Sequence, residues 1–209
     1  MNGGPIQRVV THGTFELDGG SWEVDNNIWL IGDNSNVVVF DAAHDAAPII
    51  EAVGGRHVVA VVCTHGHNDH VTVAPELGKT LDAPVLLHPA DEVLWRMTHP
   101  DKEFRAISDG EKLKVAGTEL TALHTPGHSP GSVCWYVHDL GVVFSGDTLF
   151  SGGPGATGRS YSDFPTILHS ISERLGKLAD ETVVHTGHGD STVIGDELVH
   201  YEEWVARGH

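Results

Sequence analysis

Thr64-His65-Gly66-His67-Asn68-Asp69-His70 is the stretch around which the sequence is organised, because it holds three imidazoles and one carboxylate within six residues. It follows the valine-rich run from His57 to Cys63, which is typical of a buried strand. The cluster therefore lies at the carboxyl end of a strand, where sheets flanked by helices commonly hold their chemistry. The first two histidines, spaced two residues apart, can direct two nitrogens to one ion. The aspartate and the last histidine can serve a second ion or orient water. The stretch predicts a metal site.

The composition describes a globular protein of one domain. The chain has 209 residues, of which 40% are hydrophobic and 20% charged, and a single domain over residues 1–209 is expected. No apolar stretch approaches the roughly 20 residues of a membrane helix. The N-terminal sequence, Met1-Asn2-Gly3-Gly4-Pro5, lacks the basic and apolar regions of a signal peptide. A cytoplasmic location without membrane association is therefore expected.

Charge and cysteine usage exclude several classes of partner. Twelve Lys and Arg against 29 Asp and Glu give a formal charge of -17, which opposes nucleic-acid binding because phosphate contacts need clustered cations. The expected partner is a small-molecule substrate, and a homo-oligomer is compatible with the sequence. The two cysteines, Cys63 and Cys134, lie in apolar runs and are expected to be buried thiols rather than a disulfide.

Hydrophobic periodicity predicts strands that first pair locally and later alternate with helices, in two similar halves before and after Gly117. Strands are expected over 6–10, 14–17, 22–30, 36–40, 57–63, 84–87, 112–115, 119–123, 132–137, 142–144 and 182–185. Helices are expected over 48–53, 71–81, 88–97, 165–178 and 196–206. Asp41, at the end of one strand, is expected either to hydrogen-bond a ligand histidine or to cap a turn. Two sheets packed face to face, with helices outside, would bury runs of this kind.

Three further strand ends carry polar residues that suit the same site. The loop Thr125-Pro126-Gly127-His128-Ser129-Pro130-Gly131-Ser132 has prolines and glycines that hold its histidine in one direction. Ser145-Gly146-Asp147-Thr148 places a carboxylate after an apolar strand, and Gly187-His188-Gly189-Asp190 places a histidine after another.

These four motifs together, THGHNDH, TPGHSPGS, FSGDTLF and TGHG, resemble the metallo-β-lactamase superfamily, and within it the glyoxalase II-like (hydroxyacylglutathione hydrolase-like) hydrolases. The resemblance runs from about Asn36 to Asp190. It implies an α/β fold, the αβ/βα four-layer sandwich, with two mixed sheets flanked by helices. In its brevity after the last motif the chain is similar to actinobacterial glyoxalase-like proteins, which implies mycothiol-linked substrates.

The resemblance also implies a ligand set for two divalent transition metals, with zinc preferred and iron or manganese as alternatives. The first metal site would comprise His65, His67 and His128. The second metal site would comprise Asp69, His70 and His188. Asp147 would bridge the two, and Asp69 would also act in catalysis by steering the nucleophile or passing its proton onward. Imidazole and carboxylate donors without thiolate are typical of a catalytic site that keeps positions open for water.

The preferred function is metal-dependent hydrolysis of a thioester of a low-molecular-weight thiol by a metal-bound hydroxide. The alternatives are a persulfide dioxygenase, which would use one iron held by His65, His128 and Asp147, and a lactone or β-lactam hydrolase. The acidic charge disfavours RNA processing, and His67 disfavours the flavodiiron group, which has a glutamate there. A non-catalytic binding module would normally lack a ligand.

Substrate contacts are expected from the glycine-rich loop after Asp147, and Arg159 and Tyr161 are the candidates. Two features depart from the glyoxalase II pattern. Val71-Thr72-Val73 stands where a small glycine-containing turn is common, and no glutathione-binding helical domain follows the catalytic core, so glutathione is not the expected carrier thiol. Of the remaining histidines, five are expected at the surface (His12, His57, His138, His200 and His209) and five could approach the site (His44, His88, His124, His169 and His185).

Overall fold

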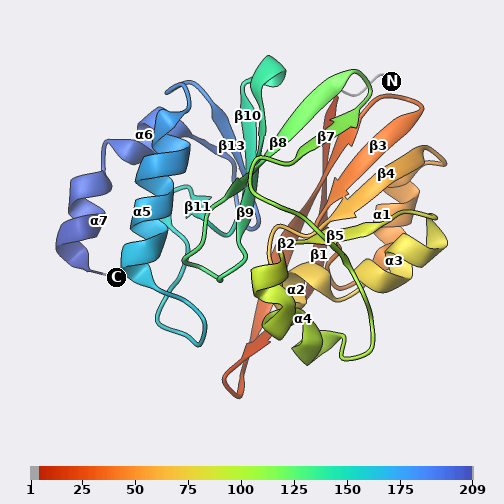
Figure 1. Ribbon diagram of the computed structural model, residues 1–209, viewed down its shortest axis with the longest axis horizontal. Helices are drawn as coiled ribbons and strands as arrows, with labels where there is room; N and C mark the ends of the chain where they lie inside the picture. Colours follow the sequence, from red (N-terminus) through yellow and green to blue (C-terminus); the bar gives the residue numbers. More distant parts are fainter. Residues whose placement is uncertain (1–4, 209) are drawn as a thin grey trace.

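Two six-stranded mixed sheets face each other in the computed structural model, which describes residues 5–208 (Figure 1). The first sheet contains, in spatial order, β1 (Ile6–Leu17), β2 (Gly20–Gly32), β3 (Asn36–Phe40), β4 (His57–Val62), β5 (Val85–Leu87) and β6 (Arg105–Ala106). The second contains β14 (Thr192–Val193), β13 (Val183–Thr186), β10 (Val142–Gly146), β9 (Val133–Val137), β8 (Thr118–His124) and β7 (Lys112–Val115). A two-stranded sheet of β11 (Leu149–Phe150) and β12 (Gly153–Pro154) follows β10.

Each sheet combines antiparallel and parallel pairs. In the first sheet β1, β2 and β3 pair antiparallel, and β3 to β6 pair parallel. In the second sheet β7 to β10 and β13–β14 are antiparallel, and β10–β13 is parallel. Parallel neighbours end at the same edge of a sheet, so the loops after β3 and β4, and those after β10 and β13, are brought together in pairs.

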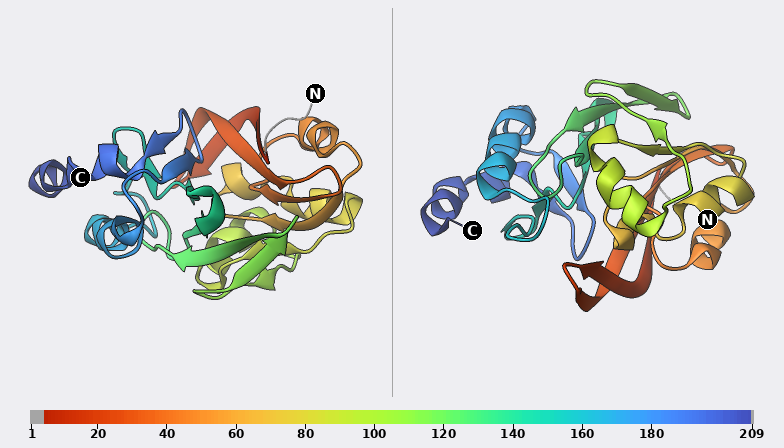
Figure 2. Two further views of the ribbon diagram at one scale, coloured as in Figure 1. Left: turned by 90° about the horizontal axis from the view of Figure 1, so that it is seen from above. Right: turned by 60° about the horizontal axis from the view of Figure 1, so that its bottom comes forward.

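Helices cover the outer face of each sheet (Figures 1 and 2). The helices of the first half are α1 (Ala46–Val53), α2 (Asn68–Val71), α3 (Ala74–Thr80), the 3₁₀ turn η1 (Pro89–Asp91) and α4 (Glu92–Thr98). Those of the second half are the 3₁₀ turn η2 (His138–Leu140), α5 (Phe164–Arg174), the 3₁₀ turn η3 (Leu175–Lys177), α6 (Ile194–Leu198) and α7 (Tyr201–Arg207). Among residues 5–208, no helix is both long enough and apolar enough to cross a bilayer.

Three apolar cores separate the four layers, and the alternation of side chains along each strand produces them. In β3, Val37 and Val39 face the core under α1 and α3, whereas Val38 and Phe40 face the opposite sheet. The core between the sheets joins residues such as Phe40 to Phe144 of β10. A third core packs β9, β10 and β13 against α5, α6 and α7. This arrangement confirms the expected four-layer sandwich of two mixed sheets flanked by helices.

Several local expectations were wrong. The helix expected over 71–81 begins only at Ala74, as α3, because a separate short helix, α2, already occupies Asn68–Val71 inside the histidine cluster. The final helix expected over 196–206 is divided into α6 and α7. The two short strands expected before residue 18 are one continuous strand, β1, paired along its whole length with β2. The division between the halves lies before Lys112 rather than at Gly117, since β7 belongs to the second sheet.

Candidate metal centre

Seven side chains that follow four different strands converge in one cluster. Two histidines lie in the extended loop after β4, and the next two residues of the set lie in α2, directly behind that loop. The others follow β8, β10 and β13. The seven, all of them predicted from the sequence, are His65, His67, Asp69, His70, His128, Asp147 and His188, and they form three groups whose nitrogen and oxygen atoms lie within 4.8 Å of one another.

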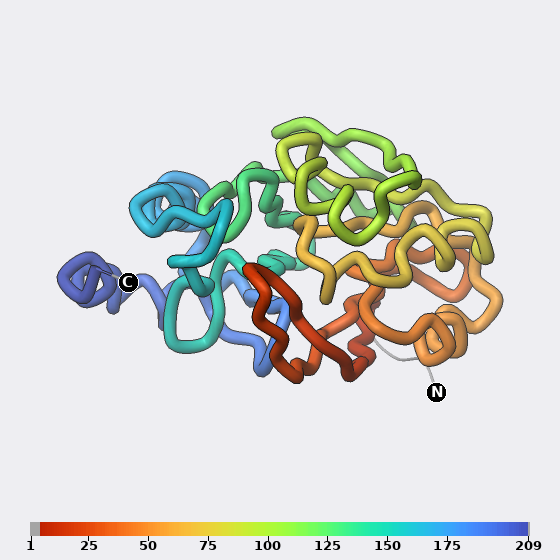
Figure 3. The backbone as a smooth tube through the Cα atoms, turned by 90° about the horizontal axis from the view of Figure 1, so that it is seen from below, coloured from red at the N-terminus to blue at the C-terminus, as the bar shows by residue number. Residues whose placement is uncertain are grey.

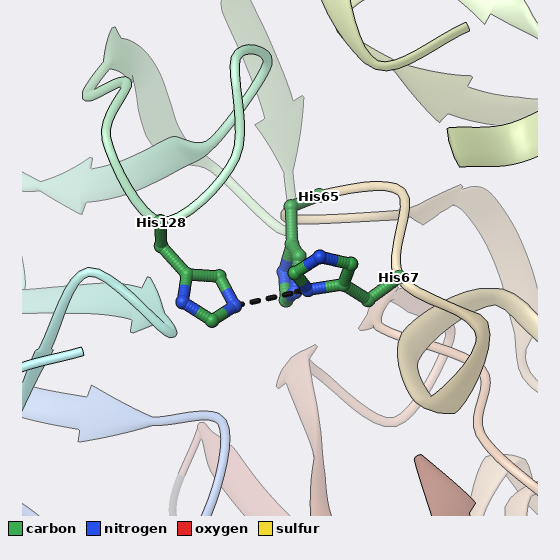
Figure 4. Close-up of side chains that lie close together, drawn as sticks. All are labelled: His65, His67 and His128. Atoms are coloured by element: carbon green, nitrogen blue, oxygen red, sulfur yellow. Dashed lines mark hydrogen bonds between the residues drawn. The ribbon is translucent and has the colours of Figure 1, made fainter. Parts of the chain in front are cut away.

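The first metal site is a triangle of imidazole nitrogens (Figure 4). Nδ1 of His67 lies 3.0 Å from Nε2 of His65 and 3.0 Å from Nε2 of His128. Zinc–nitrogen bonds of 2.0–2.1 Å in tetrahedral geometry would place ligand nitrogens roughly 3.3 Å apart. The three histidines therefore fit a single ion of this size with little rearrangement.

The second metal site adjoins the first. Nε2 of His70 lies 3.3 Å from Nε2 of His188, which in turn lies 3.4 Å from Oδ2 of Asp69. Asp69 and His70 are buried, whereas the His188 side chain is 25% exposed and forms the open side of the group. Two imidazoles and one carboxylate form a donor set that suits zinc, iron or manganese.

Asp147 lies between the two groups. Its Oδ2 is 3.6 Å from Nε2 of His128 and 3.3 Å from Nε2 of His188, so one carboxylate faces both sites. Its Oδ1 is buried and has no hydrogen-bond partner among the described residues, although Nε2 of His70 lies 3.4 Å from it. A Cβ at Gly187 would lie 2.1 Å from this Oδ1, so the glycine allows the end of β13 to approach it. An unpartnered buried carboxylate oxygen among imidazoles is a group that a cation would satisfy.

The outer nitrogens of three histidines are held by oxygen acceptors. His70 donates from Nδ1 to Oδ2 of Asp41 at 2.8 Å, which answers the open question about this aspartate. His128 donates from Nδ1 to the carbonyl of Ala156 at 2.8 Å, and His188 donates to the carbonyl of Asp25 at 2.7 Å. Such bonds fix the ring tautomer so that Nε2 presents its lone pair to the cluster.

The electrostatics of the two sites differ. Burial, reinforced by the neighbouring His70 and His67 rings, holds the pKa of His65 well below its usual value, and burial lowers the pKa of His67 to about 3. Burial would also lower the pKa of His188, but the carboxylate of Asp147 and its hydrogen bonds more than offset this and raise it to about 10. The first site thus offers neutral imidazoles, and the second combines imidazoles with the carboxylates of Asp69 and Asp147, which attract a cation.

Asn26, which the sequence did not assign to the site, and His44, one of the five histidines expected to be able to approach it, are neighbours of the cluster. Asn26 donates from Nδ2 to Oδ2 of Asp69 at 3.3 Å, and its Oδ1 accepts from Nε2 of His44 at 2.8 Å. Asn26 lies in β2 and His44 in the loop after β3, and both are distant from Asp69 in sequence. The available signal was that Asn26, in Asp25-Asn26-Asn27, interrupts an otherwise apolar strand.

His88, His124, His169 and His185 belong to none of the three donor groups among the described residues, and His169 is exposed on α5. His88 and His124 stack on each other with ring centroids 4.1 Å apart, and His185 stacks on Trp29 at 4.3 Å. Cys63 is buried next to the cluster in sequence but is not part of any of the three donor groups among the described residues.

Arg159 lines a small pocket beside the cluster, whereas Tyr161 is not part of that lining. A small pocket beside the first metal site is lined by Phe15, His67, His128, Ala156, Arg159, Ser160 and Ser162. The loop that carries Arg159 lies beside the hairpin of β1 and β2, the red segment in Figure 3, and the backbone N–H of Ser160 donates to Asp18 in that hairpin at 3.0 Å. Tyr161 has a left-handed backbone with φ of 70° and is 44% exposed, outside the pocket lining.

Comparison with known sequences gives relatives over most of the chain. The family model described as the metallo-beta-lactamase superfamily matches residues 22–188. A protein of Bacillus subtilis named "Probable metallo-hydrolase YqgX" is 35% identical over 80% of this chain and 86% of its own length. A hydroxyacylglutathione hydrolase of Aeromonas salmonicida is 32% identical over 78% of this chain and 61% of its own length.

Solved structures show the same architecture. The B3 metallo-beta-lactamase BLEG-1 superposes with a TM-score of 0.75 and 28% identity, over 93% of this chain and 99% of that chain. TTHA1623, in a di-iron-bound form, gives a TM-score of 0.74 and 31% identity over 82% and 91% of the two chains. ETHE1 from Myxococcus xanthus gives 0.74 at 24% identity, over 94% and 88% of the two chains, which is a likeness of fold alone. Because the family model matches residues 22–188 and relatives of 30% identity or more cover most of its length, the chain belongs to the metallo-beta-lactamase superfamily.

Proposed function

We propose that the chain is a dinuclear metal hydrolase that cleaves a thioester of a low-molecular-weight thiol. The observation that carries this proposal is the pair of adjoining donor groups with Asp147 between them. One ion needs three or four protein ligands at a catalytic site, and seven side chains are present. Zinc is the proposed metal. The di-iron form of TTHA1623 supports iron as the alternative.

Two bound divalent cations lower the pKa of a shared water and polarise the substrate carbonyl, which is the chemistry that hydrolysis requires. The residues of this chain hold the cations and orient the reactants. Asp69 is kept as a carboxylate, because His70 and His188 more than offset the effect of burial and lower its pKa. Its hydrogen bond from Asn26 fixes Oδ2, so Asp69 is suited to accept a proton from the attacking water or to steer it.

The pocket beside the first metal site favours a leaving group that departs without a proton. Its lining contains Arg159, Ser160 and Ser162 but no carboxyl group, and its two histidines are the proposed ligands His67 and His128. A thiolate, with a pKa near 8.5, leaves as an anion, whereas an amine needs a general acid. The similarity to a hydroxyacylglutathione hydrolase supports the same substrate class.

A substrate panel tests this proposal. The metal-loaded protein would be assayed under anaerobic conditions against thioesters of several small thiols, a lactone and a β-lactam. We expect turnover of at least one thioester, and this turnover should persist when zinc or manganese replaces iron. The values of kcat/KM for the lactone and the β-lactam should lie well below the kcat/KM for that thioester. Inert thioesters, together with iron(II)-dependent oxygen uptake on a persulfide in a separate aerobic assay, would overturn the proposal in favour of a dioxygenase.

A further inference from the structure

Asp91, at the end of η1, is a fully buried carboxylate outside the metal cluster that joins two loops distant in sequence. Its Oδ2 accepts hydrogen bonds from the backbone N–H of Gly66 at 2.7 Å and from Oγ of Ser129 at 2.7 Å. Its Oδ1 accepts from the backbone N–H of Gly131. A buried carboxylate is costly unless it is hydrogen-bonded, and these three donors satisfy both oxygens.

The three donors are close in sequence to the three histidines of the first metal site. Gly66 lies between His65 and His67, and Ser129 and Gly131 follow His128. We infer that Asp91 is a positioning residue that fixes the separation of these two loops and thereby sets the metal affinity of the first site. The inference rests on the proposed two-metal function and concerns only which residue controls one of its ions.

The packing around Asp91 leaves little freedom for either loop. A Cβ added at Gly66 would lie 3.0 Å from Cβ of Asp91, and one added at Gly131 would lie 2.7 Å from its Cγ. Both positions are glycine, so each backbone comes directly against the carboxylate. Asp91 therefore sets the distance between the loops through contact as well as through hydrogen bonds.

The second metal site has separate supports. His70 donates to Asp41, His188 donates to the carbonyl of Asp25, and Asp69 accepts from Asn26. Asp91 bonds to neither the second site's ligands nor these three supports among the contacts described above. A change at Asp91 should consequently weaken the first ion and spare the second.

The substitution Asp91→Asn isolates the hydrogen-bonding role because the shape of the side chain is retained. An amide has one oxygen and one NH₂ group, and the N–H groups of Gly66 and Gly131 contact different oxygens of Asp91. In either orientation of the amide, one N–H donor faces another donor. One of the two loops then loses its bond to residue 91.

The test places this substitution in two backgrounds that each retain one complete metal site. His188→Ala leaves the first site intact, and His128→Ala leaves the second. The dissociation constant for Zn²⁺ alone would be measured in each by competition with a chromophoric chelator, and the Co²⁺ absorption spectrum would report the coordination. We expect Asp91→Asn to weaken binding roughly ten- to a hundredfold in the His188→Ala background. In the His128→Ala background the constant should change less than about twofold, since that ion has other supports.

The control for Asp91→Asn is the same substitution at an exposed aspartate outside both metal sites. Asp45→Asn, the same change at the exposed cap of α1, should leave both constants unchanged because Asn caps a helix as well as Asp. Equal weakening of Zn²⁺ binding by Asp91→Asn in both backgrounds, or no weakening in the His188→Ala background, would overturn the inference.

Ser129→Ala removes one donor to Asp91 and serves as the test if Asp91→Asn does not fold. Severalfold weaker Zn²⁺ binding confined to the first site supports the positioning role, and unchanged binding refutes it. Wild-type protein that holds one ion per chain would instead disprove the two-metal proposal, while the comparison in the His188→Ala background would still report on Asp91.

Discussion

The guanidinium carbon of Arg159 lies 3.7 Å from the centroid of the Trp22 ring and 5.6 Å from that of Phe15. This contact connects the loop after β12 to the β1–β2 hairpin directly beside the first metal site. A cation over an aromatic ring contributes about 0.5–1 kcal/mol at an exposed position and more when desolvated. Arg159 can therefore hold the loop on the hairpin, bind the substrate, or do both.

Substitutions at both partners separate these roles. If Arg159 binds the substrate, Arg159→Ala should lower kcat/KM roughly ten- to a hundredfold, the equivalent of about 1.5–3 kcal/mol for a charge-assisted hydrogen bond, with metal content intact. Trp22→Leu removes the stacking partner and should have a smaller effect on kcat/KM. Equal losses of kcat/KM in the two variants, with equally lowered melting temperatures, would show that the arginine only holds the loop. The measurements are steady-state kinetics and thermal melting.

Asp147→Asn should reduce metal retention at both sites. The amide is neutral and has a single oxygen, so it cannot face both sites as an anion. We expect elemental analysis to fall from two ions per chain toward one or fewer, and turnover to fall by more than the 10–100-fold that outer partners of a metal site typically cost. Asp45→Asn serves as the control and should retain both ions. Full metal occupancy and activity in Asp147→Asn would be incompatible with a bridging carboxylate.

His88 should contribute a pH dependence to stability. Burial and the stacked His124 ring lower the pKa of His88 to about 4, and its Nδ1 accepts a hydrogen bond from the backbone of Ala90. The unfolded chain, with a His pKa of about 6.5, binds more protons between these values. The stabilisation is therefore present above pH 6.5 and is lost as the pH falls toward 4.

His88→Asn keeps a side chain that can cap η1 but does not titrate. The melting temperature of the metal-free protein should fall less between pH 7 and pH 4.5 in this variant than in the wild type. An equal fall of the melting temperature in both proteins over that range would exclude His88 as the source of the pH dependence.

The stacked rings of Phe40 and Phe144 join the two sheets, with centroids 4.3 Å apart and each ring 1% exposed. Phe144→Ala would leave a cavity between the sheets and should cost about 3–5 kcal/mol of unfolding free energy. Phe144→Leu fills much of that space and should cost less. Urea denaturation of the metal-free variants measures both. A similar loss of unfolding free energy in the two variants would indicate that the cavity is not the cause of the destabilisation.

The parts of the fold that were predictable from the sequence are those with a strong side-chain pattern. Val37–Phe40 is apolar throughout, and the strand Asn36–Phe40 has the expected bounds. The two-residue strands β6 and β14 carry no such pattern and were missed, because backbone pairing with a neighbour defines them. The start of α2 within the cluster was missed for a related reason: the turn is closed by a bond from the N–H of His70 to the carbonyl of His67.

The candidate site follows the same division. Each of the seven clustered side chains lies at or just after a strand end and has a local sequence signature, so its position could be predicted without coordinates. Asn26 and Asp91 were not predicted at the site, and His44 was one of five histidines that could approach it, because their contacts arise only when distant segments pack together. Arg159 was expected at the site because of its loop, but its contact with Trp22 depends on how the hairpin folds over that loop.

The separation of the ligands along the chain also governs when the second metal site can first be complete. His70 and His188 are 118 residues apart, and they meet only after both sheets have packed together. During synthesis, at about 5–20 residues per second, the nascent chain would expose the first histidine cluster for several seconds before the last ligand emerges. A metal captured in that interval would be held by an incomplete set and could exchange freely. The second metal site can thus be complete only after both halves of the protein have been made and have packed together.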